Sequence, residues 1–330
     1  MLNALLTRPL IAALAVAAAW LPSSNLAAAE PLTIGYSDYI SYVAWEVAIQ
    51  KGWFKEAGLD VKFVWFEYAP SMEAFQAGKI DALNVASSDQ LVMAGASKKP
   101  SKATLITDYS NGNDKVIAKP GITSLKDLKG KKVGVEVGLV DHLLLLKALE
   151  SAGMTMDDIT VVNMVTTDTP QGLASGSVDA VACWQPNANA TLKLVPGSKA
   201  LFTSADVPGL IYDVLAVSEE SLAAHRAEWT KVNLVWERVV AYIADPKTQA
   251  DAVAIMAAKN GVDPKEYAAF VPGSKLHSLA DNRAAFVMGK PGFGTLYGAH
   301  VISDDFNRLV KVYDAKLDVA ALIDGSLVGK

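Results

Sequence analysis

Acidic side chains follow several of the strands that the sequence predicts, where carboxylates can hold a ligand through charge and hydrogen bonds. They are Asp38, Asp89, Glu136, Asp141 and Asp213. An aspartate in the first turn of a helix can instead accept hydrogen bonds from backbone N–H groups, so capping is the competing interpretation for Asp38, Asp89 and Asp141. Glu136 ends a strand and Asp213 interrupts an apolar run, and either would need a partner if buried. That partner is a ligand, an internal lysine or backbone amides.

Aromatic side chains fall in the same segments, namely Tyr39, Tyr42, Trp45, Tyr109 and Trp184. Trp184 leads directly into the turn at Pro186, which favours an indole at a strand end that lines a cleft. Ordinary helix packing is the alternative for Trp45. Carboxylates beside aromatic faces suit a small cation. None of the segments 37–45, 87–89, 109–113, 136–141 and 184–185 contains Lys or Arg, the residues that would meet an anion.

Further polar candidates in or beside these segments are Ser88, Asn111, His142 and Gln185. Capping or packing is the simpler interpretation for His142, and Cys183 is expected to be a small buried apolar residue. The sequence contains no zinc-ligand spacing, P-loop, nucleophile elbow or dinucleotide-binding glycine motif. We therefore expect no catalytic residue, no metal and no cofactor, although a triad built from distant residues would escape this search.

The elements that would position these residues alternate between strands and helices. Strands are predicted at 32–36, 61–65, 82–85, 103–107, 132–135, 160–165 and 181–184. Helices are predicted between them at 42–51, 72–76, 89–96, 141–151 and 171–174. This alternation predicts an α/β fold with mostly parallel sheets covered by helices. Beyond Val217, the stretches 221–244, 247–259 and 304–312 predict amphipathic helices without intervening strands, packed on the first lobe.

An internal repeat divides the chain. The segment 32–36 resembles 132–136 and 77–83 resembles 175–181, with offsets of 99 and 98 positions between Ile34 and Val133 and between Asp81 and Asp179. Two similar α/β lobes are expected from this agreement. A length of 330 residues also suits two domains.

Composition and the N-terminus restrict the class of protein. A net charge of -5 and the absence of a basic cluster argue against binding to nucleic acid. Arg8, the apolar run 9–21 and the small residues 27–29 are typical of a secretory signal peptide ending at residue 29, with a buried helix as the alternative. No cysteine follows the run, so we expect a periplasmic protein without a lipid anchor.

The segments 52–61, 78–82, 124–134 and 176–180 resemble the periplasmic substrate-binding proteins of ABC importers for nitrate, taurine and alkanesulfonates. The segments 108–114, 135–138, 184–186 and 207–213 resemble the branch associated with uptake of urea or guanidine. The resemblance implies a two-lobed, type II-like periplasmic binding protein fold with two chain crossings at a hinge. Lobe 1 would comprise 30–118 and 213–330, with the C-terminal helices packed on it, and lobe 2 would comprise 119–212.

The resemblance also implies partners and a function. We expect a monomer that captures a small, nitrogen-rich, guanidine-like cation between its lobes and delivers it to a membrane permease and ATPase. Within this family the ligand could instead be urea, taurine, an alkanesulfonate or nitrate. A protein of this kind can also present its ligand to a membrane receptor, and the pyrimidine synthases of the same fold are enzymes. Those enzymes carry a cysteine-rich motif, whereas this chain has one cysteine.

Overall fold

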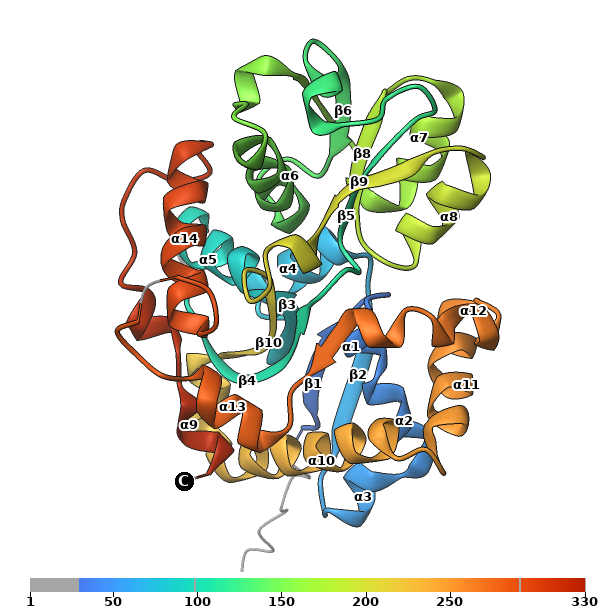
Figure 1. Cartoon of the computed structure of the whole chain (residues 1–330). Coiled ribbons are helices and arrows are strands. Elements are labelled where there is room, and N and C mark those ends of the chain that lie inside the picture. The colour runs from blue at the N-terminus through green and yellow to red at the C-terminus, as the bar shows by residue number, and fades with distance from the viewer. Residues whose placement is uncertain (1–29, 98, 291, 330) are drawn as a thin grey trace, which may run out of the picture. The chain divides into compact units, whose positions relative to one another are not determined.

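The computed structural model describes residues 30–97, 99–290 and 292–329, which contain two β-sheets (Figure 1). The first sheet has six strands in the order β11-β4-β10-β3-β1-β2. Their bounds are β1 Leu32–Tyr36, β2 Val61–Trp65, β3 Ala82–Ala86, β4 Ser101–Ser110, β10 Tyr212–Ser218 and β11 Ser274–Leu276. The strands β2, β1 and β3 are parallel, and β10 runs antiparallel between β3 and β4.

The second sheet has five strands in the order β7-β6-β8-β5-β9. Their bounds are β5 Lys115–Ala118, β6 Lys132–Val135, β7 Thr160–Asn163, β8 Ala180–Cys183 and β9 Lys199–Thr203. Here too, three parallel strands (β7, β6 and β8) are followed by an antiparallel neighbour, β5. The strands β2, β1, β3 and β10 of the first sheet therefore have the same order and directions as β7, β6, β8 and β5 of the second.

The internal repeat is confirmed at the level of single hydrogen bonds. The backbone N–H of Thr33 donates to the carboxylate of Asp81 at 2.8 Å, and that of Lys132 donates to the carboxylate of Asp179 at 2.9 Å. In each case an aspartate just before a buried strand ties it to the neighbouring strand. The two echoed sequence segments are thus equivalent positions in the two sheets.

Helices link the strands in the order that the alternation predicts. Their bounds are α1 Ile40–Val43, α2 Trp45–Lys51, α3 Trp53–Glu56, α4 Tyr68–Gln76, α5 Ser87–Ala96, α6 Val140–Ser151, α7 Thr169–Ser175 and α8 Asn187–Leu194. The C-terminal part supplies α9 Glu219–Ala224, α10 Arg226–Ala244, α11 Gln249–Asn260, α12 Pro264–Ala268, α13 Leu279–Ala285 and α14 Leu296–Leu309. Among the helices that the structure describes, none has the length and apolar character that a bilayer crossing requires.

The C-terminal helices cover the first sheet, as predicted. Trp229 and Trp236 of α10 are fully buried and share one apolar core with Ile34 of β1 and with α2. Figure 1 shows α10 running beneath this sheet and α14 beside α5. This core packs against the first sheet and stabilises the strands that carry the loops at their carboxyl ends.

Two expectations about the strands need correction. Lys115–Ala118 forms β5 and pairs with β8 and β9 of the second sheet, whereas the expected boundary places its residues in lobe 1. The turn at Pro120 and Gly121 follows this strand, and a turn there resembles a lobe boundary. A short strand, β11, also follows residue 217, where only helices are expected; its three residues are too few to give a periodic signal. The predicted signal peptide, residues 1–29, lies outside the described residues.

Candidate functional site

Buried carboxylates follow strands of both sheets. Asp89 lies in the first turn of α5, Asp141 lies in the first turn of α6, and Glu136 directly follows β6. All three are buried, and Asp89 and Asp141 are fully so. The charges of Glu136 and Asp89 are among the causes that raise the pKa of Asp141, so each of them interacts electrostatically with Asp141.

Asp89 is held by donors from both halves of the molecule. Its carboxylate accepts hydrogen bonds from the Tyr68 hydroxyl at 2.7 Å, the Ser88 hydroxyl at 2.9 Å and the backbone N–H of Val140 at 3.3 Å. Val140 begins α6, so this last bond crosses from the first sheet's loops to the second's. Burial nevertheless raises the pKa of Asp89 to about 7, because three hydrogen bonds do not replace the lost hydration.

Asp141 accepts no hydrogen bond at either carboxylate oxygen, although both oxygens are buried. The capping interpretation is therefore wrong for this residue. Burial raises its pKa well above the usual value, and the carboxyls of Asp114, Glu136 and Asp89 raise it further. An uncompensated buried carboxyl of this kind is costly unless a ligand or a proton meets it.

Glu136 accepts one hydrogen bond, from the Thr166 hydroxyl at 3.2 Å. Burial is the main cause that raises its pKa to about 7. It lines a 200 Å³ pocket together with Asp38, Tyr68 and Trp184. Because Asp38 and Tyr68 follow strands of the first sheet while Glu136 and Trp184 follow strands of the second, the pocket lies between the two sheets.

A second group of acids lies on the hinge side, where the chain passes between the sheets. Asp213 of β10 faces Asp108 of β4 in the strand register, and the Tyr42 hydroxyl donates to Asp213. Both oxygens of Asp108 and one oxygen of Asp213 are buried without a hydrogen-bond partner. Burial raises the pKa of both groups, and the charge of Asp108 raises that of Asp213 further. Asp114 accepts from Ser110 and has its pKa raised to about 6, mainly by burial.

Sequence reasoning missed Asp108, Asp114 and Tyr68 as site residues. The two aspartates bound the polar segment 108–114 at the end of β4, and strand-end position was the signal that could have found them. Tyr68 begins α4 and gave no such signal. Its hydroxyl reaches Asp89, and its ring packs edge-on against Trp184 with centroids 5.0 Å apart.

Few cationic groups approach these acids. Lys115 contributes a favourable charge near Asp114, but its amino group donates to the Gly112 carbonyl, and burial lowers its pKa. His277 favours the ionised form of Asp108. Among the ion pairs between described residues, none includes Asp89, Asp108, Asp141 or any other member of the two groups. The described residues also contain no group of three or more side chains suited to a metal.

Several predicted residues have other roles. Trp45 is fully buried against Trp236 with centroids 4.7 Å apart, and its indole N–H donates to Asn84, so its prediction as a cleft residue is wrong. The physical reason is tertiary packing, because the indole contacts Phe54, Phe63 and Trp236 in the core under the sheet. Tyr109 lies in a separate pocket beside Tyr212.

The remaining predicted residues form hydrogen bonds with neighbouring groups of the protein. The Tyr39 hydroxyl accepts from Ser274 at 3.2 Å. Gln185 accepts from the N–H of Asn189 at 3.0 Å. His142 accepts from the N–H of Gly138, and burial lowers its pKa to about 4, so its ring is neutral.

Asp38 accepts from Trp184 and Asn187, so its predicted capping role is replaced by contacts with the second half. Asn111 lies beside the hinge, with its N–H donating to the Gly273 carbonyl.

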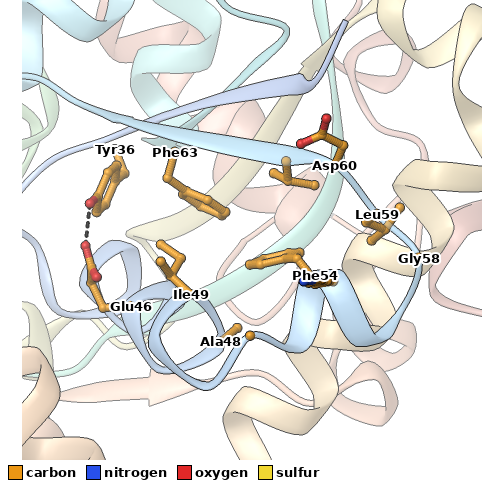
Figure 2. Close-up of a pocket in the computed structure, with 12 residues that line it drawn as sticks. Tyr36, Glu46, Ala48, Ile49, Phe54, Gly58, Leu59, Asp60 and Phe63 are labelled. Carbon is orange, nitrogen blue, oxygen red and sulfur yellow. Dashed lines mark hydrogen bonds between the residues drawn. The ribbon is translucent and has the colours of Figure 1, made fainter. Parts of the chain in front are cut away.

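A larger pocket, of 650 Å³, lies elsewhere. It opens on the first sheet between α2, α3 and β2 (Figure 2). Its one buried acid, Glu46, accepts from the Tyr36 hydroxyl and pairs with Lys259 at 3.1 Å. Because Glu46 is already compensated and no predicted site residue lines this pocket, the smaller pocket between the sheets is the stronger candidate.

Comparison with known proteins identifies the family. The family model described as NMT1/THI5 like matches residues 42–250. The chain belongs to the NMT1/THI5-like family. A protein of Brucella abortus strain 2308, provisionally named a binding protein, is 30% identical over 248 residues, which cover 73% of this chain and 76% of that relative. The taurine-binding periplasmic protein of Escherichia coli is 26% identical over 140 residues, 42% of this chain and 43% of its own.

A solved member of the same fold supports the architecture. The periplasmic aliphatic sulphonate binding protein SsuA of Escherichia coli superimposes with a TM-score of 0.72 and 21% identity, over 91% of this chain and 99% of its own. The predicted α/β periplasmic binding protein fold is thereby confirmed for this member of the NMT1/THI5-like family. The assignment to the urea or guanidine branch remains a prediction.

Proposed function

We propose that this protein is the periplasmic solute-binding component of an ABC importer and that its ligand is a small, guanidine-like cation held between the two sheets. One observation carries the proposal: Asp141 is fully buried, accepts no hydrogen bond and lies among further buried carboxyls. A cation would supply the charge and the N–H donors that these oxygens lack. Each charge-assisted hydrogen bond contributes about 1.5 to 3 kcal/mol.

The aromatic side chains favour the same ligand class. Trp184 and Tyr68 line the pocket beside Glu136, and their ring faces attract a cation. A guanidinium ion is planar and carries donors around its edge, so it can stack on a ring while it donates to carboxylates. This combination supports a flat organic cation over a spherical metal ion.

The anions bound by named relatives are the main alternative. A sulfonate or nitrate placed beside Asp89, Asp141 and Glu136 would meet like charges, and burial would strengthen the repulsion. Neutral urea has a similar shape, but it would leave the carboxylate charges uncompensated. We therefore expect guanidinium to bind about tenfold or more tightly than urea, which corresponds to about 1.4 kcal/mol.

The same proposal includes the lobes and the partners. Lobe 1 would comprise 30–114 and 213–330 and lobe 2 would comprise 115–212, so that β5 belongs to lobe 2 together with the strands it pairs with. The segments that connect the sheets, 111–114 and 204–211, would form the hinge and allow the lobes to close on the ligand. A permease and an ATPase would receive it, and residues 1–29 would direct export to the periplasm.

Isothermal titration with guanidinium, urea, taurine and nitrate tests the ligand class. The expected result is one-to-one binding of guanidinium, weaker binding of urea and no heat from taurine or nitrate. Tight binding of taurine or nitrate without a response to guanidinium would overturn the cation proposal. Recovery of the bound compound unchanged after long incubation would separate a binding protein from an enzyme.

A further inference from the structure

Helix α8 makes polar contacts with the opposite half of the molecule. At its start, the Asn187 amide donates to the carboxylate of Asp38 at 3.0 Å. Farther along, Asn189 and Lys193 both donate to Glu266 of α12. Since α8 follows β8 of the second sheet while Asp38 and Glu266 belong to the first half, these bonds span the two halves on one side of the pocket.

Asp38 also accepts a hydrogen bond from Trp184, an aromatic residue that lines the pocket. Its second carboxylate oxygen accepts from the indole N–H of Trp184 at 3.2 Å. Each of its two oxygens therefore accepts a hydrogen bond from the second half. The backbone carbonyl of Asp38 in turn accepts from Asn260 of α11 at 2.7 Å, so the first half fixes the position of the residue.

We infer that Asp38 is a positioning residue that fastens α8 and Trp184 over the occupied pocket and thereby slows release of the ligand. The inference rests on the proposed function, because it assumes that a ligand occupies the pocket between the sheets. Its carboxylate makes these bonds only when the two halves are together. They must consequently break before a ligand held between the halves can leave.

The inference predicts how substitutions change the association and dissociation rates of the ligand. Residues that touch the ligand affect capture and release, whereas a contact made only on closure affects mainly the dissociation rate. Asp38 is half-buried, and its two bonds to the second half are charge-assisted, so its contribution should be large. The pair formed by Lys193 and Glu266 is exposed, with 62% and 26% of the side chains accessible, and should contribute little.

Stopped-flow binding of guanidinium to the full chain tests the inference. Asp38→Ala should raise the dissociation rate about tenfold or more and change the association rate less than about twofold. Asn187→Ala should act in the same direction, and the double variant should be less severe than the two single effects combined. Glu266→Gln should change the dissociation rate less than about fivefold. Glu73→Gln, which removes one exposed charge from α4, serves as the matched control and should change neither rate.

Asp38→Asn keeps the size of the side chain and guards against misfolding of the alanine variant. It should melt like the wild type and still release ligand faster, because an amide accepts more weakly than a carboxylate. A dissociation rate equal to the wild type in both Asp38 variants would overturn the inference. So would a slower association rate with unchanged dissociation, since this would make Asp38 a ligand-steering charge.

A second measurement works without any ligand and separates this inference from the proposed function. Spin labels at Lys199→Cys and Lys247→Cys report the distance between the halves, while Cys183 is buried and shielded from labelling. The wild type should populate a short distance that Asp38→Ala depletes. If no compound in the titration panel binds, the proposed ligand is wrong, but a depleted short distance still supports the role of Asp38. An unchanged distribution overturns that role.

Discussion

The buried carboxyl of Asp141 should weaken the ligand-free fold. Its two oxygens are buried without donors, so an isosteric amide should remove an uncompensated charge at little steric cost. We expect Asp141→Asn to raise the free energy of unfolding of the ligand-free protein by about 1 to 3 kcal/mol. The same change should weaken guanidinium binding at least about tenfold.

Thermal melts and titration calorimetry of this variant provide the check. Asp157→Asn is a suitable control, because Asp157 is exposed and should alter neither quantity. A destabilised Asp141→Asn protein would show that this carboxyl has a structural partner and would weaken the case for a cationic ligand.

Burial of the carboxyls also predicts a pH dependence. The pKa values of Asp89 and Glu136 are about 7 in the native protein and about 4 when unfolded, so their stabilising contribution is complete below pH 4 and is lost as pH rises through 7. His142 and His300 act in the opposite direction, because their native pKa of about 4 makes stability rise up to about pH 6.5. The carboxyls should therefore dominate between about pH 6.5 and 8.

Melting temperatures measured over this interval test the sign. The ligand-free protein should melt at a lower temperature at pH 8 than at pH 6.5, and Asp89→Asn should flatten the difference. Guanidinium should raise the melting temperature more at pH 8, since the ionised carboxyls bind it better. A melting temperature that rises steadily to pH 8 would contradict these assignments.

Trp184 should report ligand binding through its fluorescence. Its indole lines the pocket and donates to Asp38, so a ligand stacked on the ring should change the emission. Trp184→Phe should abolish most of the ligand-dependent change while the fold is retained. Trp45→Phe is the comparison, because that residue is buried in the core away from the pocket and should leave the change intact.

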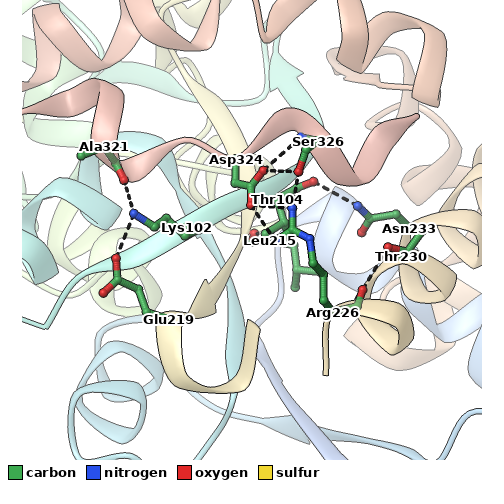
Figure 3. A network of polar contacts seen from close by, with 10 residues as sticks. All are labelled: Lys102, Thr104, Leu215, Glu219, Arg226, Thr230, Asn233, Ala321, Asp324 and Ser326. Atoms are coloured by element: carbon green, nitrogen blue, oxygen red, sulfur yellow. Dashed lines mark hydrogen bonds and ion pairs between the residues drawn. The ribbon is translucent and has the colours of Figure 1, made fainter. Parts of the chain in front are cut away.

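At the scale of elements, the C-terminal segment stabilises the first sheet by covering part of β4. Only Asp108 to Ser110 of β4 pair with β11, and farther back Ala103 forms a parallel bridge with Ile323. Figure 3 shows the polar contacts that fix this segment: Lys102 donates to the Ala321 carbonyl, and Arg226 pairs with Asp324 at 3.1 Å. The segment thus satisfies part of a strand that would otherwise present an open edge.

The buried contact in this region should matter more than the exposed ones. The amide of Gln90 is buried and donates to the carbonyls of Ser101 and Leu322, so Gln90→Ala should lower the free energy of unfolding by about 1 to 3 kcal/mol. Arg226→Ala removes an ion pair that is half exposed and should cost less than about 1 kcal/mol. Urea denaturation compares the two, and an equal or reversed order would contradict the argument.

The sequence predicts this architecture well where one element is decided by its own residues. Apolar, β-branched runs such as Val61–Trp65 predict strands with the right bounds, and the repeated aspartates predict the equivalence of the sheets. Prediction fails where tertiary contacts decide. The burial of Trp45 depends on its packing against Trp236 of α10, and the pairing of β5 with β8 depends on strands far along the chain.

The candidate site shows the same limit. Strand-end position predicts Asp89 and Glu136 as site residues, because the carboxyl ends of strands gather at one edge of a sheet. Asp213, near the start of β10, is predicted instead from the apolar run that it interrupts. It cannot show that Asp38 accepts hydrogen bonds from residues 146 and 149 positions away or that Asp141 accepts none. These facts depend on how the two halves come together, which no local pattern contains.

At the scale of the whole molecule, the distribution of charge matters more than the net value of -5. The ion pairs of the described residues involve groups such as Lys102, Arg226 and Arg308. None of them includes the buried acids between the sheets, which are Asp89, Asp108, Asp114, Glu136, Asp141 and Asp213. Separation of the halves lets water reach these acids and weakens the repulsion among them. The repulsion therefore favours separated halves in the absence of a ligand. A cation would reverse this balance by attracting carboxyls from both halves at once.

Small-angle scattering provides the test of this balance. A compact chain of about 300 residues has a radius of gyration of about 19 Å, and the protein with guanidinium should approach this value. The ligand-free protein should have a larger radius at pH 8, where more of the acids are ionised, than at pH 6. Asp141→Asn should reduce this pH effect and should show no ligand-induced contraction at a guanidinium concentration that saturates the wild type. Nitrate at the same concentration serves as the control for ionic strength. A radius that is insensitive both to guanidinium and to pH would mean that the halves do not move, and the acids of the pocket would then need another explanation than a cation captured by closure.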